Sequence, residues 1–422
     1  MALYRAIERG DLASFRGILD SAPAAADRLL RNRVSSFGPY AGFTPLMMAC
    51  ALGHTEVVRE IFSRNLDYAN VRLSNGLTPI MIACETGNVP ILTLLTSAID
   101  DRNIINSQRT SDGATALIIA CKQENPVARV IETLGANSLG NGLNPDIPDR
   151  LGNTALMYLC DGSNRRDVIR LLLEMRASVN TRNRMDMTPL MKACMRPNNR
   201  STVEELLEAG AAVNAVRKPD GATALLLAIN NKNNEAASTL IRKGANINLG
   251  TAHTGYTPLM IACEKGSLDL IKKLVDNGAN VNAARRDNGS TALIYASSRP
   301  SGATEIVHYL LKQNANVNAV TSDVRSTALM WASFKGNEGA VSHLLSYKAN
   351  PHLKTTSGKT ALTFATLGRH SRIIKTLTKL QKNTKLTRNA TGKYKNKEKA
   401  TRRKSSSTDL LDLLLRTKIT GR

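Results

Sequence analysis

Apolar residues recur along most of the chain in one pattern that starts at a threonine. A leucine or isoleucine follows two positions after this threonine, and five positions after it stands alanine in nine copies and Leu159 in the other. Because positions three apart lie on the same face of an α-helix, each copy predicts a short helix that buries one large and one small side chain. The threonine is a favoured helix N-cap, and four copies place a proline at the first helical position: Pro45, Pro79, Pro189 and Pro258.

A second helix is expected after the first in most copies. Apolar residues at helical spacing predict it over residues 56–62, 167–173, 268–275 and 305–311. It usually closes on a turn such as Gly244-Ala245-Asn246, in which glycine can adopt the left-handed conformation that ends a helix. Each copy of the pattern therefore predicts a helix-turn-helix unit.

The ten copies share one register. Their threonines stand 34, 37, 39, 34, 35, 34, 34, 36 and 33 residues apart, at Thr44, Thr78, Thr115, Thr154, Thr188, Thr223, Thr257, Thr291, Thr327 and Thr360. A period near 33 residues built on T-P-L-x-x-A resembles the ankyrin repeat, which implies a β-turn followed by two antiparallel helices. The resemblance implies an all-α solenoid of about ten helix-turn-helix repeats with an N-terminal cap.

The sequence departs from the family at the histidine that usually follows T-P-L. Six copies hold methionine there, at Met47, Met81, Met157, Met191, Met260 and Met330. Because methionine fills irregular spaces well, we interpret these residues as core.

Three regions are expected along the chain. Residues 1–41 form N-terminal capping helices and a loop, with a helix pair over residues 3–19. Residues 42–383 form the ankyrin-repeat solenoid, and residues 384–422 form a basic, largely disordered tail. Extra glycine, asparagine and proline residues at 134–152 predict an extended loop inside the solenoid.

The six cysteines occupy one position, six residues after the repeat threonine, at Cys50, Cys84, Cys121, Cys160, Cys194 and Cys263. Other copies hold Ile, Ser or Thr there, so we interpret it as a small core site and expect no disulfide, no metal and no cofactor. No serine or cysteine lies in a recognised nucleophile motif, and we expect no enzymatic activity. No long uncharged apolar run or secretory signal occurs, so we expect no membrane span and an intracellular, cytoplasmic protein.

The chain has 57 Lys and Arg against 34 Asp and Glu, a formal net charge of +23, which favours an acidic partner. Residues 384–422 hold 12 of these cations against three acids. Three interpretations of the tail stay open: a nuclear-import signal, a clamp for RNA or a membrane surface, and a segment that improves solubility. Its basic cluster comprises Lys393, Lys395, Lys397, Arg402, Arg403 and Lys404. A short leucine-rich helix that docks in a groove or caps the last repeat would contain Leu410, Leu413 and Leu414.

Candidate partner contacts come from positions that vary between otherwise regular copies. Four residues after the threonine, the last three copies hold Tyr295, Trp331 and Phe364, and neighbouring positions hold Arg299, Phe334 and Lys335. Aromatic residues beside cations are typical of binding hot spots, so we predict a partner site here on the concave surface. The alternative is that the rings widen the core between repeats. The turn segments before each threonine, which we call fingers, carry cations that favour an acidic partner: Arg182, Arg184, Arg217, Arg285 and Arg286.

These patterns predict a non-catalytic, monomeric scaffold or adaptor that binds a protein partner on the concave ankyrin surface. An alternative is a structural component of a nucleic-acid-containing assembly, which would contact phosphates through the basic tail and the finger arginines. The sequence does not separate a host scaffold from a third class, an enzyme adaptor or a pathogen-delivered effector.

Overall fold

The computed structural model describes residues 1–34, 38–99, 102–123, 127–136, 142–162, 165–265 and 267–390. The chain divides into two compact units, and we treat each by itself: unit 1 is Met1–Ala252, and unit 2 begins at His253. Regular structure in the described residues is helical, apart from isolated antiparallel bridges in three fingers, Val216 with Thr223, Ala284 with Thr291 and Val320 with Thr327. The predicted all-α fold is confirmed.

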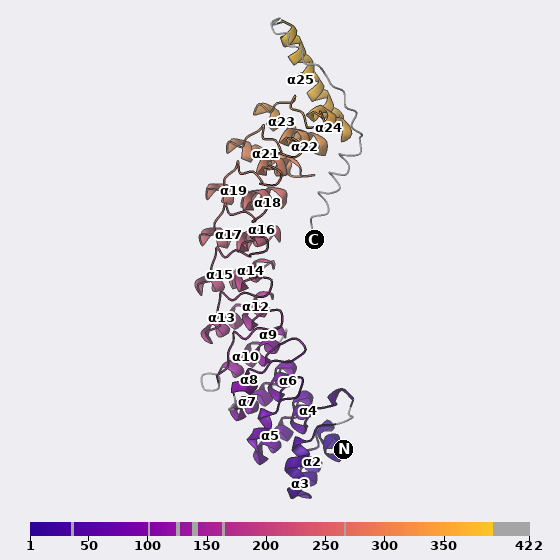
Figure 1. The fold of residues 1–422 in the computed structure, drawn as a ribbon, viewed down its shortest axis with the longest axis vertical. Helices are drawn as coiled ribbons and strands as arrows, with labels where there is room; N and C mark the ends of the chain where they lie inside the picture. Colours follow the sequence, from indigo (N-terminus) through magenta and orange to yellow (C-terminus); the bar gives the residue numbers. More distant parts are fainter. Residues whose placement is uncertain are drawn as a thin grey trace. The chain divides into compact units, whose positions relative to one another are not determined.

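Unit 1 consists, in its described residues, of an N-terminal helix group and six helix pairs (Figure 1). The group comprises α1 (Ala2–Glu8), α2 (Leu12–Asp20) and α3 (Pro23–Arg31), so the helix pair predicted at residues 3–19 is present. The pairs are α4 (Pro45–Leu52) with α5 (Thr55–Arg64), α6 (Pro79–Thr86) with α7 (Val89–Ala98), α9 (Ala116–Lys122) with α10 (Val127–Ala136), α12 (Ala155–Cys160) with α13 (Arg166–Glu174), α14 (Pro189–Cys194) with α15 (Arg200–Glu208), and α16 (Ala224–Asn230) with α17 (Asn234–Arg242). Short helices η1 (Gly38–Tyr40), η2 (Leu66–Asn70) and α8 (Arg102–Ile105) lie between them in the sequence.

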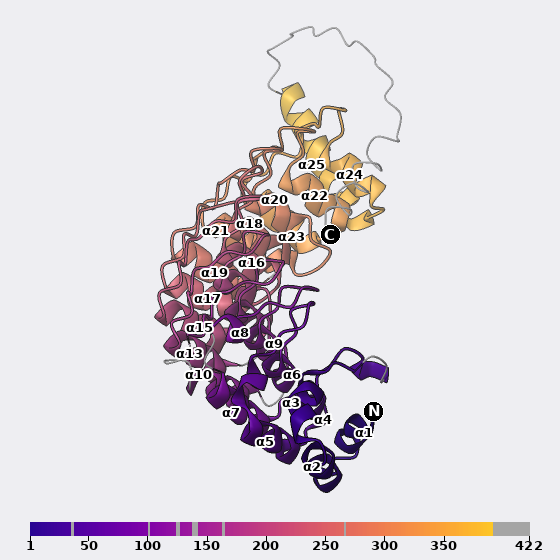
Figure 2. The ribbon, with the colours of Figure 1, turned by 60° about the horizontal axis from the view of Figure 1, so that its bottom comes forward.

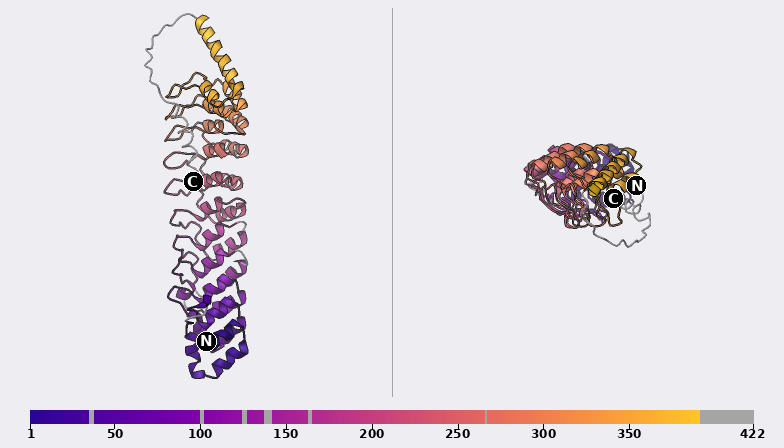
Figure 3. Two further views of the ribbon diagram at one scale, coloured as in Figure 1. Left: turned by 90° about the vertical axis from the view of Figure 1, so that its right-hand side faces the viewer. Right: turned by 90° about the horizontal axis from the view of Figure 1, so that it is seen from above.

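Unit 2 consists of four helix pairs over its described residues. They are α18 (Pro258–Lys265) with α19 (Leu268–Asp276), α20 (Ala292–Ser297) with α21 (Ala303–Lys312), α22 (Ala328–Lys335) with α23 (Glu338–Ser346), and α24 (Ala361–Leu367) with α25 (Ser371–Ala390). The four second helices predicted from the sequence correspond to α5, α13, α19 and α21. Within each unit the first helices form one layer and the second helices another (Figure 2), and the fingers project in a row from one side (Figure 3).

Most repeat threonines cap the first helix as predicted. The hydroxyl accepts a hydrogen bond from the backbone N–H three residues later at Thr44, Thr115, Thr188, Thr223, Thr257 and Thr327. Each such cap contributes about 1 kcal/mol. The capping prediction is wrong in three repeats, where the buried hydroxyl has no partner among the described residues: Thr78, Thr154 and Thr291. Thr360 differs again, because its N–H donates to the Thr363 hydroxyl at 3.3 Å.

The core of each unit lies between neighbouring helix pairs. The large residue two positions after the threonine and the small residue five positions after it are buried, as at Leu46 and Ala49, with Leu362 of the last repeat half-buried as the exception. The six methionines at the family's histidine position are at most 1% exposed, which confirms their interpretation as core. Burial of each such side chain contributes about 1.5–3 kcal/mol.

Side chains near the turn between the two helices of one repeat bond carbonyl groups in, or just after, the first helix of the preceding repeat. Asn199 donates to the Cys160 carbonyl at 2.9 Å, and Asn337 donates to the Arg299 carbonyl at 2.7 Å. The His370 ring donates to the Phe334 carbonyl at 2.9 Å. Because a helix end leaves carbonyl groups without intrahelical partners, these bonds cap one repeat and tie it to the next.

Two boundaries differ from the sequence analysis. Helix α10 continues to Ala136 and buries Leu134, so the loop predicted at residues 134–152 begins later than expected. Helix α25 continues to Ala390, past residue 383, where the solenoid was expected to end. Residues 391–422 lie outside the described part of the chain. Among the described helices, none combines the length and the apolar character needed to cross a membrane.

Candidate partner-binding surface

The position four residues after the repeat threonine is buried in some repeats and partly exposed in others. It is buried in six repeats and half-buried in four, at Tyr158, Lys192, Tyr295 and Trp331. Counted from Thr44, these are repeats four and five in unit 1 and repeats eight and nine in unit 2. Both pairs of repeats place aromatic side chains beside cations.

Tyr295 of α20 belongs to a polar network. Its hydroxyl accepts a hydrogen bond from Arg285 at 2.7 Å, and its ring centroid lies 5.2 Å from that of Tyr256. Arg285 also lies 5.0 Å from the Tyr256 centroid and donates to Asp287 at 2.9 Å. Burial raises the pKa of Tyr295, and the hydrogen bond from Arg285 opposes this shift. Tyr295 therefore presents a ring whose orientation is held by neighbouring side chains.

Trp331 and Phe334 are half-buried side chains of α22. The Trp331 indole donates to the Ser326 hydroxyl at 3.1 Å. The Phe334 ring meets the Phe364 ring edge-on, with centroids 6.4 Å apart, and the Lys335 ammonium lies 5.6 Å from the Phe334 centroid. Trp331, Phe334 and Lys335 thus form a partly exposed group held by contacts beneath it.

Phe364 does not reach the surface. Its side chain is 4% exposed and supports Phe334 from within the core. Its predicted role as a partner contact is therefore corrected to a packing role, because α24 contributes this ring to the interface with α22.

Arg299, which was predicted as a partner contact, bonds carbonyl groups at the end of a helix. Its guanidinium donates to the Glu264 carbonyl at 2.7 Å and to the Cys263 carbonyl at 3.4 Å, both in α18. It also donates to the Ser301 carbonyl at 3.2 Å. Through Nη1, this side chain ties repeat eight to repeat seven.

The predicted finger arginines divide into two groups. Three of them pair with an aspartate of their own finger: Arg182 with Asp186, Arg217 with Asp220, and Arg285 with Asp287. The other two, Arg184 and Arg286, are exposed. Because adjacent carboxylates neutralise three of the five charges, the fingers are less basic than their arginine content suggests.

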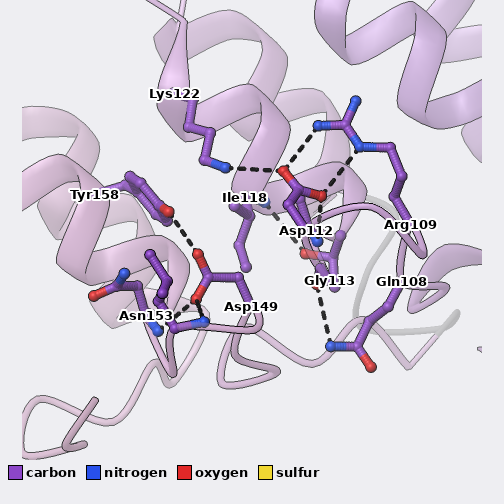
Figure 4. Close-up of polar contacts among 12 residues, drawn as sticks. Gln108, Arg109, Asp112, Gly113, Ile118, Lys122, Asp149, Asn153 and Tyr158 are labelled. Carbon is purple, nitrogen blue, oxygen red and sulfur yellow. Dashed lines mark hydrogen bonds and ion pairs between the residues drawn. The ribbon is translucent and has the colours of Figure 1, made fainter. Parts of the chain in front are cut away.

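A second cluster, centred on Tyr158 of α12, was not predicted as a site from the sequence. The Tyr158 hydroxyl donates to the buried Asp149 carboxylate at 2.5 Å (Figure 4). The Lys122 ammonium lies 4.7 Å from the ring centroid, and the Lys192 ammonium lies 5.8 Å from it. Since Lys122 belongs to the preceding repeat and Lys192 to the following one, three neighbouring repeats meet at this ring.

The cations around Tyr158 have carboxylate partners of their own. Asp112 lies 3.3 Å from Lys122 and 2.9 Å from Arg109 (Figure 4), and Asp161 lies 3.7 Å from Lys192. Hydrogen bonding to Arg109 lowers the pKa of Asp112, so this carboxylate is ionised at neutral pH. The sequence signal was available, because Tyr158 and Lys192 occupy the same variable position as Tyr295 and Trp331.

Two exposed apolar side chains, also missed by the sequence analysis, lie at the fingertips of repeats four and five. Leu151 is 62% exposed and Met185 is 61% exposed. The N–H of Arg184 donates to the Leu151 carbonyl at 2.9 Å, which places the two fingertips side by side. Two neighbouring fingertips of unit 1 therefore each carry an exposed apolar side chain.

All six cysteines are free and buried, and burial raises the pKa of each thiol. In the part of the chain that the structure describes, no group of three or more His, Cys, Asp and Glu side chains could hold a metal ion. The predicted tail residues, Lys393, Lys395, Lys397, Arg402, Arg403, Lys404, Leu410, Leu413 and Leu414, lie outside the described residues.

A family model described as ankyrin repeats matches segments that together span nearly all of the described chain: residues 3–104, 47–138, 99–183, 131–217, 179–251, 225–321 and 319–390. The chain belongs to the ankyrin-repeat family. Ankyrin repeats are generally protein–protein interaction modules. The crystal structure of the human ASB11 ankyrin repeat domain is similar to this ankyrin chain at 23% identity and a TM-score of 0.46, over 53% of this chain and 98% of that one. A comparison with curated proteins gives no match.

Proposed function

We propose that this ankyrin-repeat protein is a non-catalytic scaffold or adaptor that holds a protein partner on unit 2. The contact surface consists of Tyr295, Trp331, Phe334 and Lys335. The observation that carries the proposal is that successive first helices, α20 and α22, present half-buried aromatic rings with a cation beside them. Aromatic anchors of this kind supply most of the free energy at many protein interfaces.

The rings are held in place before a partner arrives. Trp331 is tied to Ser326, Phe334 rests on Phe364, and Tyr295 is bonded by Arg285. Few additional side chains therefore have to be ordered on binding. Each side chain that has to be ordered would reduce the binding free energy by about 0.5–1.5 kcal/mol.

The partner should offer an apolar side chain next to a carboxylate. The rings accept the apolar group, and Lys335 makes no ion pair within the described residues, so its charge is available to an acidic group. Phosphate contact through the finger arginines has less support, because aspartates neutralise Arg182, Arg217 and Arg285.

An intracellular, cytoplasmic location is part of the proposal, because free, buried cysteines suit a reducing compartment.

We also propose that the protein is a monomer. A mass of 45.7 kDa by light scattering would support it, and a mass twice as large would contradict it.

Site-specific photocrosslinking in the protein's own cells tests the surface. A crosslinking benzoylphenylalanine replaces Trp331 or Phe334 in the full chain, and the matched control carries it at Tyr347, an exposed aromatic residue that follows α23 in the same repeat. We expect one protein to be crosslinked from positions 331 and 334 and not from 347, and Lys335→Glu to remove the crosslink. Equal crosslinking from position 347, or a crosslink that nuclease treatment abolishes, would argue against the proposal.

A further inference from the structure

The net charge of the protein is concentrated near its C-terminal end. Residues 311–383 contain eleven Lys and Arg against two Asp and Glu, a net charge of +9, and residues 384–422 contribute another +9. Only +5 of the total of +23 remains for residues 1–310. The last two repeats are therefore strongly basic in their own right, in addition to the tail that follows them.

Helix α25 arranges part of this charge in a row. Arg372, Lys375, Lys379 and Lys382 are all exposed and follow one another at intervals of three or four residues. Because residues three and four apart lie on the same helix face, the four cations form one stripe, about 15 Å long at 1.5 Å per residue. The stripe belongs to the terminal helix of the stack, so no further repeat covers it within the described chain (Figure 1).

The opposite face of α25 fixes the helix to unit 2. Ile373 is 2% exposed and Leu377 is 1% exposed, and the helix packs against α23 and α24. The stripe is thus part of a packed element with a fixed direction.

Few cations of the stripe are paired with an acidic side chain within the described residues. Arg372 lies 3.4 Å from Glu338, but both side chains are more than half exposed, so this pair contributes little. Lys375, Lys379 and Lys382 make no ion pair within the described residues. Like charges at this spacing repel one another and reduce helix stability, and an extended polyanion would relieve that repulsion.

The structure favours one class of polyanion. A membrane-bound amphipathic helix buries its apolar face in lipid, but here that face is already buried against the protein. Lysine acts as a point charge suited to phosphate, and the residues between the cations, Thr376, Thr378 and Gln381, offer no ring on which a base could stack. A duplex presents one phosphate charge per about 1.7 Å of axis, so its backbone can match a continuous 15 Å row of cations.

We propose that the exposed face of α25, comprising Arg372, Lys375, Lys379 and Lys382, binds the sugar–phosphate backbone of a double-stranded nucleic acid without reading its sequence. This site is separate from the partner surface on α20 and α22 and does not depend on the function proposed for it. It also differs from phosphate contact through the finger arginines, because the cations are on a helix and mostly lack carboxylate partners.

The experiment measures the affinity of the full chain for a fluorescent, mixed-sequence duplex of about 20 base pairs by anisotropy, between about 50 and 200 mM salt. The test variant replaces the four cations by glutamine (R372Q, K375Q, K379Q and K382Q). A matched control removes four exposed cations from the N-terminal helix group of unit 1 and the residues next to it (R5Q, R9Q, R28Q and R33Q). A third variant, K375R with K379R and K382R, keeps the charge.

Each phosphate contact contributes about 0.9 to the slope of log affinity against log salt. We therefore expect the test variant to lose about 3–4 units of slope, so that the wild type weakens about 100-fold more than the variant over this salt range. The control and the arginine variant should keep the wild-type slope. Trp331 fluorescence and circular dichroism verify that each variant is folded.

Four results would overturn the proposal. The first is a wild-type chain that does not bind the duplex at low salt. The second is a test variant with the wild-type slope, which would assign the contacts to other cations. The third is binding of phosphatidylserine vesicles or polyglutamate, but not of the duplex, through the same four residues. A more than tenfold preference among unrelated duplex sequences would contradict backbone recognition.

Discussion

Replacing Arg299 by alanine separates a structural role from a binding role in unit 2. The guanidinium holds the last carbonyls of α18 through its bonds to Glu264 and Cys263, and it also reaches Ser301. Arg299→Ala removes all three bonds at once and leaves the α18 end without its cap. We expect this variant to destabilise unit 2 and to leave partner crosslinking at position 331 intact.

The magnitude follows from the geometry of the three bonds. Hydrogen bonds from charged donors contribute about 1.5–3 kcal/mol. The bond to Glu264, at 2.7 Å, is short, whereas those at 3.2 and 3.4 Å are long and contribute less. We therefore expect Arg299→Ala to lower the free energy of unfolding by about 2–3 kcal/mol. Since urea m-values are about 1–3 kcal/mol per molar, the unfolding midpoint should fall by about 1 M.

Trp331 makes the assay specific to unit 2, because it is the single tryptophan of the chain. Urea unfolding followed by its fluorescence gives the midpoint. Lys272→Ala, which removes an exposed cation of α19, is the control and should change the stability by less than about 0.5 kcal/mol. An Arg299→Ala midpoint equal to that of the wild type, combined with loss of the partner crosslink, would refute the reasoning and identify Arg299 as a contact residue.

Three further predictions use simple measurements. Phe364→Ala should lower the stability of unit 2 by about 3–5 kcal/mol in the same fluorescence assay, because the ring is buried; a loss below about 1 kcal/mol would place it at the surface. The rings of His308 and His343 stack with centroids 4.2 Å apart, and burial and the charge of His343 lower the pKa of His308 below 6.5. Below pH 6.5 the unfolded state therefore binds more protons than the folded state, so the free energy of unfolding should fall as the pH drops below 6.5. His343→Gln should weaken this pH dependence. A pH profile of the urea midpoint that is the same in the variant and the wild type would contradict the prediction. The six buried thiols should react with Ellman's reagent only in denaturant, and a thiol that reacts in the folded protein would contradict the core assignment.

Much of the fold could be predicted because repeat proteins are governed by local and nearest-neighbour interactions. The threonine and the apolar residues two and five positions later are enough to predict each first helix. The methionines and cysteines could be assigned to the core because every copy presents the same position to the same kind of neighbour. The caps at Thr78, Thr154 and Thr291 failed, because hydroxyl orientation depends on local packing that the motif does not encode.

The candidate site was less predictable from sequence. Tyr295, Trp331, Phe334 and Lys335 lie at or beside a position that tolerates different residue types, and their partial exposure agrees with that tolerance. Arg299 is a cation and Phe364 is an aromatic residue, as in the proposed partner surface, but the surroundings of these two side chains differ. The partners that define these two roles lie about one repeat away in the sequence, in α18 and α22 respectively.

The sequence by itself determined the repeat register, the helix pairs, the buried cysteines and the excess of positive charge. Tertiary structure decided which aromatic rings reach the surface, which arginines are engaged by carbonyls or aspartates, and that the cations of α25 form an exposed row. The physical reason is distance along the chain. Periodicity encodes contacts between residues three or four positions apart, whereas the burial and charge state of a side chain depend on atoms about one repeat away, which become neighbours when the repeats stack.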